Sequence, residues 1–567
     1  MFVSVLHFYG MKKLTAFLLI YFAIVALYAQ NKQEVKNLAS FAKVWGFLKY
    51  YHSEIAKGNP DWDKELIRMI PIIKVEPNND AFAKSITAWY NTLPKARLAS
   101  TITQKENDSI MHVFDEKDIR RFGVPGNLKD ELTKLYLYHL PDSNKFITDR
   151  YKQIHFDHII HNEDPFFKPA FPDEEHRLLA LFRYWNIINY FYPHKKLNAP
   201  HWDNVLERFI PLFINTNNAD EYRKAFLMLT AQIKDSHSFF GQEEWDKTYN
   251  KMNPPFTIYY IKGKYFIGES RYDSLMKQDD LKVGDEIVTV NNMPTAERAN
   301  ELKPFTTGTN QLSFYRNIAN SLFKIDSSRV IPVSLKRQGV TLKKALHLYT
   351  WQELSNYSNA HPKKLWENMG NSIWYVKICD IQSRDTLKKL FGDIQQAKTV
   401  IWDLRAYPNF KVMQVIGNGL FDHDIISSIY YNGMVLYPGA FLKHTGVAYD
   451  KIDDFKLPLY KGKMIVLVND QTQSLAESVA YELSQRPNTI IMGRQTAGTT
   501  GNILFVDYPG GIEASFTGVR SEGLNGSFSE GKGVKIDKEI KLSNNKLIEY
   551  PDYILKMAFL EALKHNN

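Results

Sequence analysis

The stretch from Met464 to Glu482 constrains the fold of this chain more than any other. It begins with five apolar residues, Met464–Val468, and three of them are β-branched. A run of this length and type is typical of a buried strand. Asn469 and Asp470 end the run, and apolar residues then recur at helical spacing up to Leu483. The sequence therefore predicts a buried strand that leads through a tight turn, at the rim of a sheet, into a helix.

Ser474 lies in this turn, at the expected entry of the helix. Its hydroxyl should be exposed, and the unpaired N–H groups of the first helical turn should point into the same space. A serine nucleophile needs this arrangement, because nearby donors can then stabilise the oxyanion that forms on attack. The same residues also match a capping box, in which Ser474 caps the helix and Glu477 reaches back. This stretch alone leaves both interpretations open.

The composition indicates a large globular protein. The chain has 567 residues, of which 44% are hydrophobic and 23% charged, enough for three or four domains with buried cores. The net charge of +9 is spread along the chain without a basic run, so we expect no nucleic-acid partner. Cys379 is the single cysteine and lies in an apolar run, so no internal disulfide can form and a buried small side chain is expected.

The N-terminal residues 1–29 are expected to be a secretory signal, with Met11 as the true start. Two lysines, an apolar core of about fifteen residues and a small residue at Ala29 form the pattern that signal peptidase recognises. A retained membrane anchor is the alternative, although the apolar stretch is short for a span. No cysteine follows the expected cleavage site, so no lipid anchor is expected there. The mature chain is predicted to be periplasmic or secreted, with no membrane span.

An internal repeat organises the N-terminal part of the chain, with one copy in residues 30–140 and the other in 176–245. Matching residues are separated by 140 positions without a gap: Trp45 and Trp185, Trp62 and Trp202, Pro71 and Pro211, Asp80 and Asp220. Apolar spacing in each copy predicts a helical hairpin with a third helix. The second copy ends in Asp235-Ser236-His237, where the first has Lys95-Ala96-Arg97. The Asp-Ser-His element is therefore not a requirement of the helical scaffold.

Residues 141–175 join the two copies and are rich in His, Asp, Pro and Phe, which predicts a long linker. His155, His158 and His161 raise the alternative of a metal site. Their spacing does not match a known ligand pattern, so we expect a solvated linker and no metal. No cofactor is predicted elsewhere.

Residues 254–345 have a different character, with strand-like segments followed by a helix. Leu281–Asn291 resembles the signature turn and strand of the PDZ domain. PDZ domains bind extended peptide tails by adding them as a strand to a sheet edge. The resemblance implies a protein or peptide partner.

Residues 370–545 alternate strand and helix, which predicts an α/β domain, placed at residues 365–567, with a parallel sheet and a ligand at the carboxyl ends of its strands. Strands are expected over Ser372–Cys379, Thr399–Leu404, Met464–Val468 and Thr489–Met492, and helices near Asp385–Gln396, Lys411–Leu420, Ser474–Gln485 and Tyr550–His565. The fold class is multidomain α+β: a helical repeat module, a PDZ-like β domain and an α/β core.

A nucleophilic Ser474 needs a base, and His237 is the best candidate because an imidazole can accept a hydroxyl proton at neutral pH. Glu530, in a glycine-bounded turn before a strand, is the candidate acid that orients the ring. Taken alone, a histidine at the end of an apolar helix and a surface glutamate are usually structural. Spacing by itself cannot bring the three together.

The last two hundred residues resemble the C-terminal-processing (tail-specific) serine peptidase family. Val466–Glu477 is similar to its nucleophile motif, Met492–Gly498 to its next strand and glycine turn, and Ile401–Arg405 to its Asp-Leu-Arg strand. In the bacterial branch a lysine base follows that glycine, whereas this chain has Thr499 there. The lysine–serine dyad is therefore absent.

The other branch, typified by the tricorn core protease, uses a Ser-His-Glu arrangement. Its motifs resemble Ser236-His237 and the Glu530 turn before Gly533–Asp537. The resemblance implies Ser474 as nucleophile, His237 as base, Glu530 as orienting acid and Ser236 as a helper near Glu530. It also implies a crotonase-like α/β core with an inserted or preceding PDZ domain.

One departure concerns the oxyanion hole. The family's glycine-rich loop after the Asp-Leu-Arg strand is replaced by Ala406-Tyr407-Pro408-Asn409, and a proline has no N–H to donate. The expected donors are Leu475 with Ala406 or Tyr407. We predict a secreted serine endopeptidase whose rate falls as the pH drops through about 6–7. The alternatives are a catalytically inactive peptidase-fold protein that binds peptides or hydrophobic ligands, and a helical adaptor that holds peptide tails.

Overall fold

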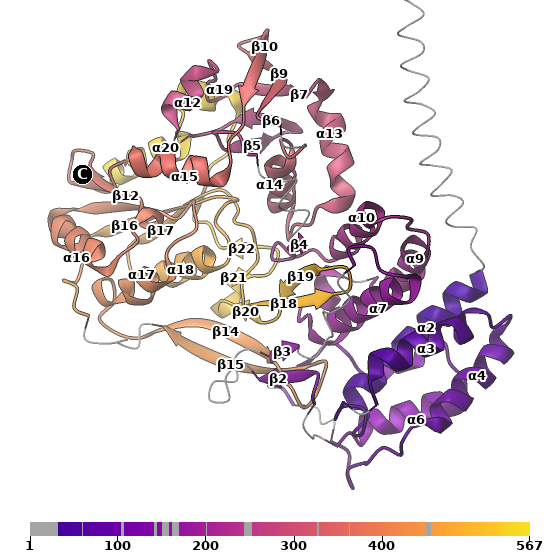
Figure 1. Ribbon diagram of the computed structural model, residues 1–567. Helices are drawn as coiled ribbons and strands as arrows, with labels where there is room; N and C mark the ends of the chain where they lie inside the picture. The colour runs from indigo at the N-terminus through magenta and orange to yellow at the C-terminus, as the bar shows by residue number, and fades with distance from the viewer. Residues whose placement is uncertain are drawn as a thin grey trace, which may run out of the picture. The chain divides into compact units, whose positions relative to one another are not determined.

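The computed structural model describes residues 32–566, apart from residues 59, 104–106, 141–143, 150–157, 161–168, 200, 243–251, 271, 326–327, 362 and 449–454 (Figure 1). The expected signal peptide, His155 and His161 lie outside these residues. The chain forms two units. The first comprises residues 1–229, 433–441 and 506–513, and the second comprises residues 230–432, 442–505 and 514–567.

The first unit is mainly helical. Its principal helices are α2 (Lys32–Tyr51), α3 (Trp62–Lys74), α4 (Asn79–Thr92), α5 (Glu116–Arg120), α6 (Gly126–Leu137), α7 (Glu174–Phe191), α8 (Lys195–Asn198), α9 (Asp203–Ile214) and α10 (Ala219–Thr230). The Nε1 of Trp45 donates to Trp62 O at 2.9 Å, and the Nε1 of Trp62 donates back to Trp45 O at 3.0 Å. Trp185 and Trp202 make the same two bonds at 2.9 and 3.0 Å. One pair of buried indoles thus joins α2 to α3, and an equivalent pair joins α7 to the start of α9.

The expected linker contains a small element of structure. Strand β2 (Ile147–Asp149) pairs antiparallel with β3 (His158–Ile160), with Ile147 opposite Ile160. Each of these strands has only three residues, which is too short for a recognisable apolar pattern in the sequence.

Residues 258–347 form an antiparallel sheet in the second unit. Its strands run in the order β10 (Val340–His347), β9 (Val330–Arg337), β7 (Glu286–Val290), β6 (Lys264–Ile267) and β5 (Ile258–Ile261), and β8 (Met293–Pro294) pairs with β7. Helices α12 (Asp273–Gln278), α13 (Thr295–Leu302) and α14 (Gln311–Ser321) accompany it. The sequence predicts strands over Phe256–Tyr260, Tyr265–Ile267 and Glu286–Val290 and a helix over Ala296–Leu302, and β5, β6, β7 and α13 confirm them. The β9–β10 hairpin was not predicted.

The remainder of the second unit contains a second, mostly parallel sheet, ordered β11 (Trp366–Asn368), β12 (Ile373–Val376), β13 (Thr399–Asp403), β16 (Lys463–Val468), β17 (Thr489–Gly493) and β23 (Lys538–Glu539). Only β11 is antiparallel to its neighbour. The predicted parallel strands are therefore confirmed, each within a few residues at its ends.

Helices cover both faces of this sheet, which explains why its strands are apolar throughout. Successive residues of β16 point to opposite faces. Met464, Val466 and Val468 join the core that contains residues of α16 (Arg384–Asp393), α17 (Phe410–Ile416) and α18 (Leu475–Ser484). Ile465 and Leu467 join the core beneath the C-terminal helix α20 (Tyr553–Asn566).

Several short or antiparallel strands escaped the sequence prediction. They are β4 (Phe240–Gln242), β14 (Ile425–Gly433), β15 (Ala440–Ala448), β18 (Ile503–Tyr508), β19 (Ile512–Thr517), β20 (Arg520–Glu522), β21 (Phe528–Ser529) and β22 (Gly533–Val534). Over the residues that the structure describes, none of the helices combines the length and apolarity that crossing a bilayer requires.

Candidate active site

Ser474 lies between the end of β16 and the first residue of α18, with φ 57° and ψ −121°. This conformation is disfavoured for a residue with a Cβ and costs on the order of 1–3 kcal/mol. Its side chain is half-buried, and its N–H donates to Thr499 O at 3.0 Å. Backbone strain of this kind gathers at functional sites, so the geometry favours a role for Ser474 beyond helix capping.

The turn is pinned to the sheet on both sides. Thr472 Oγ1 accepts from the N–H of Asn469 at 3.0 Å and donates to Leu404 O, at the end of β13, at 2.8 Å. On the other side, Gly493 has φ 144°, and a Cβ there would lie 1.9 Å from Val468 O. Only glycine permits β17 to pass this close to the end of β16, where the turn that holds Ser474 begins.

Glu477 joins the start of α18 to the glycine turn. Its carboxylate is buried and accepts from Gly498 N–H at 2.8 Å, Thr499 N–H at 3.0 Å, the Thr496 hydroxyl and Ser474 N–H at 3.3 Å. The last contact is the reach-back half of the capping box. Burial raises the pKa of Glu477 to about 7, although the four donors favour the carboxylate.

His237 follows α10 in a buried turn that Asp235 organises. Asp235 Oδ1 accepts from His237 N–H at 2.8 Å and from the Thr517 hydroxyl at 3.0 Å. Because that hydroxyl proton points at Asp235, the Thr517 oxygen can act only as an acceptor toward His237 Nδ1, which lies 3.0 Å away. The proton of a neutral ring is then assigned to Nδ1, and Nε2 keeps its lone pair, as a general base requires.

The Nε2 atom is buried and has no hydrogen-bond partner among the described residues. Burial, and secondly the positive charge of Arg316, lower the pKa of His237 to about 3. The ring is therefore neutral across the physiological range, and its single unsatisfied acceptor is the atom that would take a proton.

Ser236 and Glu530 lie at opposite ends of a chain of hydroxyl groups. Ser236 Oγ accepts from Thr309 Oγ1 at 3.0 Å, Thr309 pairs with Thr499, and Thr499 Oγ1 donates to Glu530 Oε1 at 3.1 Å. Ser236 is thus linked to Glu530 through two threonines. The expected direct bond from Glu530 to the imidazole is not made in this structure, because the ring Nδ1 pairs with Thr517 instead.

The loop after β13 leaves the sheet at the same edge as the nucleophile turn, since Asp403 is in register with Leu467 of β16. Ala406 O accepts from Cys379 Sγ at 3.0 Å, and Tyr407 is 63% exposed. Leu475 is the first residue of α18, so its N–H has no acceptor within the helix. The three expected oxyanion donors are thus at the ends of adjacent parallel strands.

The sequence reading missed the residues that support these side chains. Asp235 precedes the Ser236-His237 motif, and a carboxylate so close to a candidate base could have indicated that it orients the histidine. Thr309 and Thr517 carry no such signal, because each lies in a segment whose partner is over a hundred residues away: Thr517 pairs with Asp235, and Thr309 pairs with Thr499.

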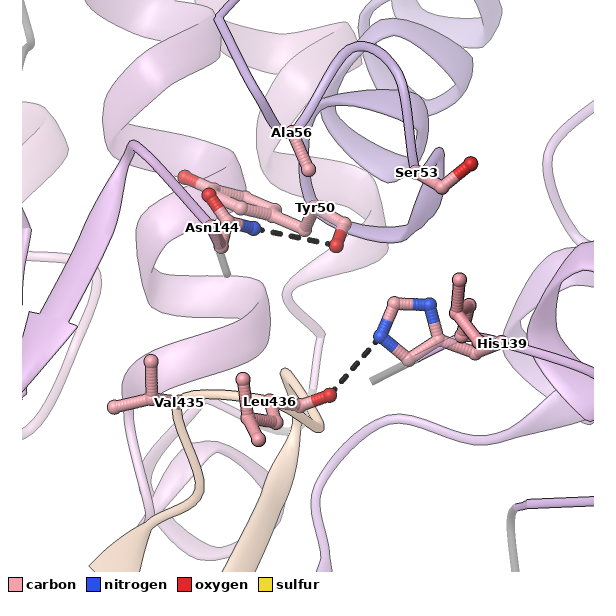
Figure 2. A pocket seen from close by; sticks show the side chains of 8 residues that line it. Tyr50, Ser53, Ala56, His139, Asn144, Val435 and Leu436 are labelled. Atoms are coloured by element: carbon pink, nitrogen blue, oxygen red, sulfur yellow. Dashed lines mark hydrogen bonds between the residues drawn. The ribbon is translucent and has the colours of Figure 1, made fainter. Parts of the chain in front are cut away.

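No group of three or more potential metal-ligating side chains occurs within the part of the chain that the structure describes. A separate enclosed cavity of about 10 Å³ lies in the first unit, lined by Tyr50, His139, Asn144 and Leu436, among others, and it has room for about one water molecule. Figure 2 shows the His139 ring bonded to Leu436 O there, at 3.0 Å. Its two ring nitrogens contact backbone carbonyls, so this histidine has a structural role.

Comparisons with known proteins agree with this description. Residues 251–345 match the PDZ domain model, and residues 424–540 match that of peptidase family S41. Similar solved structures include mature CPAF complexed with lactacystin (TM-score 0.53, 13% identity, covering 69% of this chain and 98% of that one) and mature CPAF (0.52, 13%, 69% and 96%). The photosystem II D1 C-terminal processing protease is a weaker likeness (0.41, 16%, 67% and 96%).

At such identities these likenesses concern the fold. No curated protein matches the chain in sequence. The family matches carry the assignment: the chain contains a PDZ domain over residues 251–345 and a domain of peptidase family S41 over residues 424–540, and it is a serine peptidase.

Proposed function

We propose that the protein is an exported endopeptidase that cleaves protein substrates with Ser474 as nucleophile and His237 as general base. The observation that carries this proposal is a hydrogen bond between the turn of a strained serine and the turn of a buried imidazole whose Nε2 is an open acceptor. The Nε2 of Gln473, next to Ser474, donates to Ser236 O, next to His237, at 3.2 Å. The two turns are therefore joined directly.

In the proposed reaction, Ser474 Oγ attacks the scissile carbonyl carbon while His237 Nε2 takes the hydroxyl proton. The oxyanion is stabilised by Leu475 N–H together with Ala406 or Tyr407 N–H. The tetrahedral intermediate collapses when His237 returns the proton to the leaving amine, which leaves an acyl-serine. Water, deprotonated by His237, then attacks the acyl carbon, and the proton returns to Ser474 Oγ as the product acid departs.

Two buried acids support the imidazolium that forms in each step. Asp235 acts through the Thr517 hydroxyl that contacts Nδ1. Glu530 acts indirectly, through hydrogen bonds that run by way of Thr499 and Thr309 to Ser236, the residue before His237. We therefore retain Ser474, His237 and Glu530 as the arrangement and add Asp235 and Thr517 as positioning residues.

The remaining expectations belong to the same proposal. The 140-residue offset matches α2, α3 and α4 to α7, α9 and α10, which supports two copies of one helical repeat. A parallel sheet in which β12, β13 and β16 are each followed by an α-helix supports a crotonase-like core. Cleavage after Ala29 would deliver the chain to the periplasm or the medium, and N-terminal sequencing of the mature protein tests this.

The loop at Pro408 favours one alternative, a peptidase fold that binds peptides or hydrophobic ligands without cleaving them. Pro408 cannot donate, and it is buried. If Ala406 and Tyr407 also fail to donate, the oxyanion is less stabilised, and kcat would fall by about 10²–10³-fold for each missing N–H.

The test compares residues 30–567 of the wild type with Ser474→Ala and His237→Ala. The readouts are hydrolysis of an unfolded protein such as casein and labelling by a fluorophosphonate, which requires an activated serine. Ser484→Ala, on the same helix, is the control, because among the described residues its hydroxyl bonds only to Tyr481 O. We expect both activities in the wild type and the control, and neither in the two variants. Equal rates in all four proteins would exclude the proposed reaction.

A further inference from the structure

One segment of the PDZ domain, residues 307–317, contacts three motifs of the proposed active site: the turn that holds His237, the turn that holds Ser474 and the glycine turn after β17. Thr309 donates its N–H to Ser236 Oγ at 3.0 Å and accepts from Ser236 N–H at 2.8 Å. Asn310 Nδ2 donates to Thr496 O at 2.8 Å and Ala497 O at 3.0 Å, in the glycine turn. The segment therefore lies against both the histidine turn and the turn after β17.

Arg316, on α14, extends the contact to the nucleophile turn. Its Nη1 donates to Asp470 O, and its Nη2 donates to Gln473 Oε1 at 2.7 Å. Gln473 in turn donates to Ser236 O. A continuous line of hydrogen bonds thus runs from the PDZ helix through the residue before Ser474 to the residue before His237.

The contacts of Arg316 bury a positive charge without a carboxylate that hydrogen-bonds to it. The guanidinium is only 6% exposed, yet its three hydrogen bonds go to a carbonyl and two side-chain amides, the third being Asn317 Oδ1 at 3.0 Å. A buried cation without a hydrogen-bonded carboxylate costs several kcal/mol relative to an apolar side chain of the same size. A residue retained at such a cost is expected to contribute to function.

We infer that Arg316 is a positioning residue of the peptidase reaction, and that the PDZ segment 307–317 is the scaffold against which the serine and histidine turns are aligned. The inference rests on the proposed function. The rigid planar fork of arginine holds Asp470 and Gln473 at fixed separation, which fixes where Ser474 Oγ is presented. A displacement of about 1 Å between nucleophile and base is enough to lower a rate about 100-fold.

The variants Arg316→Gln and Arg316→Lys test this inference in the full mature chain. We expect Arg316→Gln to lower kcat about 10- to 100-fold with KM within about threefold, because substrate binding does not use this side chain. Arg316→Lys should recover part of kcat, since an ammonium group can make one of the two bonds. The fall of kcat/KM at acidic pH (the acid limb) reports protonation of His237. It should move to higher pH in Arg316→Gln, which removes a positive charge near the ring, and stay in place in Arg316→Lys, which keeps that charge. The other charges near the ring, Asp235 and Glu530, are unchanged in both.

Arg337→Gln is the matched control. Arg337 lies in the same domain and pairs with Asp285 through two bonds of 2.8 Å. Among the described residues, its other hydrogen bonds go to Asp280, which lies outside the peptidase motifs. This change should lower the stability of the PDZ domain and leave kcat and the acid limb unaltered. All variants are compared where circular dichroism shows them folded.

Hydrogen exchange separates this inference from the proposed function. In a Ser474→Ala background, Arg316→Gln should raise exchange in residues 468–476 and 233–239 at least several-fold. An Arg316→Gln protein with wild-type kcat, acid limb and exchange overturns the inference. If the wild type shows no hydrolysis that depends on Ser474 and His237, the proposed function fails, and the exchange measurement alone then decides whether Arg316 braces the two turns.

Discussion

The hydroxyl of Thr517 offers the sharpest test of how the proposed base is prepared. Its oxygen is 3.0 Å from His237 Nδ1, and its proton goes to Asp235 Oδ1. This polarity makes Thr517 an acceptor only, and therefore sets the proton on Nδ1 and the lone pair on Nε2. Replacing the hydroxyl by a methyl group in Thr517→Val preserves the shape and removes the acceptor.

The expected loss of kcat/KM in Thr517→Val follows from the burial of His237, which is 1% exposed. A buried N–H without an acceptor costs about 1–3 kcal/mol, and this cost falls on the one tautomer that can act as a base. The change therefore lowers kcat/KM by about 5- to 150-fold. A larger loss, approaching 10⁴-fold, would indicate that the ring adopts the opposite tautomer almost completely.

The assay is kcat/KM on a quenched fluorogenic peptide, with thermal unfolding measured in parallel. Thr517→Ser keeps the hydroxyl and should retain most activity. Ser515→Ala is the matched control on β19, because Ser515 Oγ bonds His237 O at 2.7 Å and does not touch the ring nitrogens. A Thr517→Val protein within twofold of the wild type would refute the assignment of the base and its tautomer.

The remaining predictions concern pH and stability. A base works while it is neutral, and burial lowers the pKa of His237 to about 3, so kcat/KM should not fall between pH 7 and 5. This prediction replaces the fall at about pH 6–7 that an unperturbed imidazole would give. A fall of kcat/KM at about pH 6–7 would contradict the buried geometry. The raised pKa of Glu477, about 7, means that the folded state binds this proton more tightly, so its contribution to stability is present below about pH 4.5 and is lost as the pH rises to 7, by on the order of 3 kcal/mol. Urea unfolding of the wild type and of Glu477→Gln at both pH values should show this slope only in the wild type, although the variant is less stable throughout. Arg405 donates to both carboxylate oxygens of Asp403 and of Asp552. Arg405→Lys should therefore lower the free energy of unfolding by about 3–5 kcal/mol. A change below about 1 kcal/mol, measured by urea unfolding, would show that these ion pairs contribute little.

Local patterns in the sequence were sufficient for much of the fold. The strands β12, β13, β16 and β17 are apolar on both faces because helices cover both, and such runs are recognisable without a structure. The turn at Ser474 could be placed because it separates two segments of clear periodicity. Strands that expose one face, such as β18, or are very short, such as β4, gave no comparable pattern and were missed.

The partners of His237 could be known only from the tertiary structure. Thr517 is 280 positions away, Arg316 is 79 positions away, and each lies in an element with its own local explanation. Hydrogen bonds between such residues depend on which strand edges and helix ends pack together, which no local periodicity encodes. The amino-acid sequence by itself therefore determined the long apolar strands and helices and the candidate serine, histidine and glutamate. Packing decided that a threonine, rather than the glutamate, contacts the imidazole, because only the folded chain brings β19 against the turn after α10.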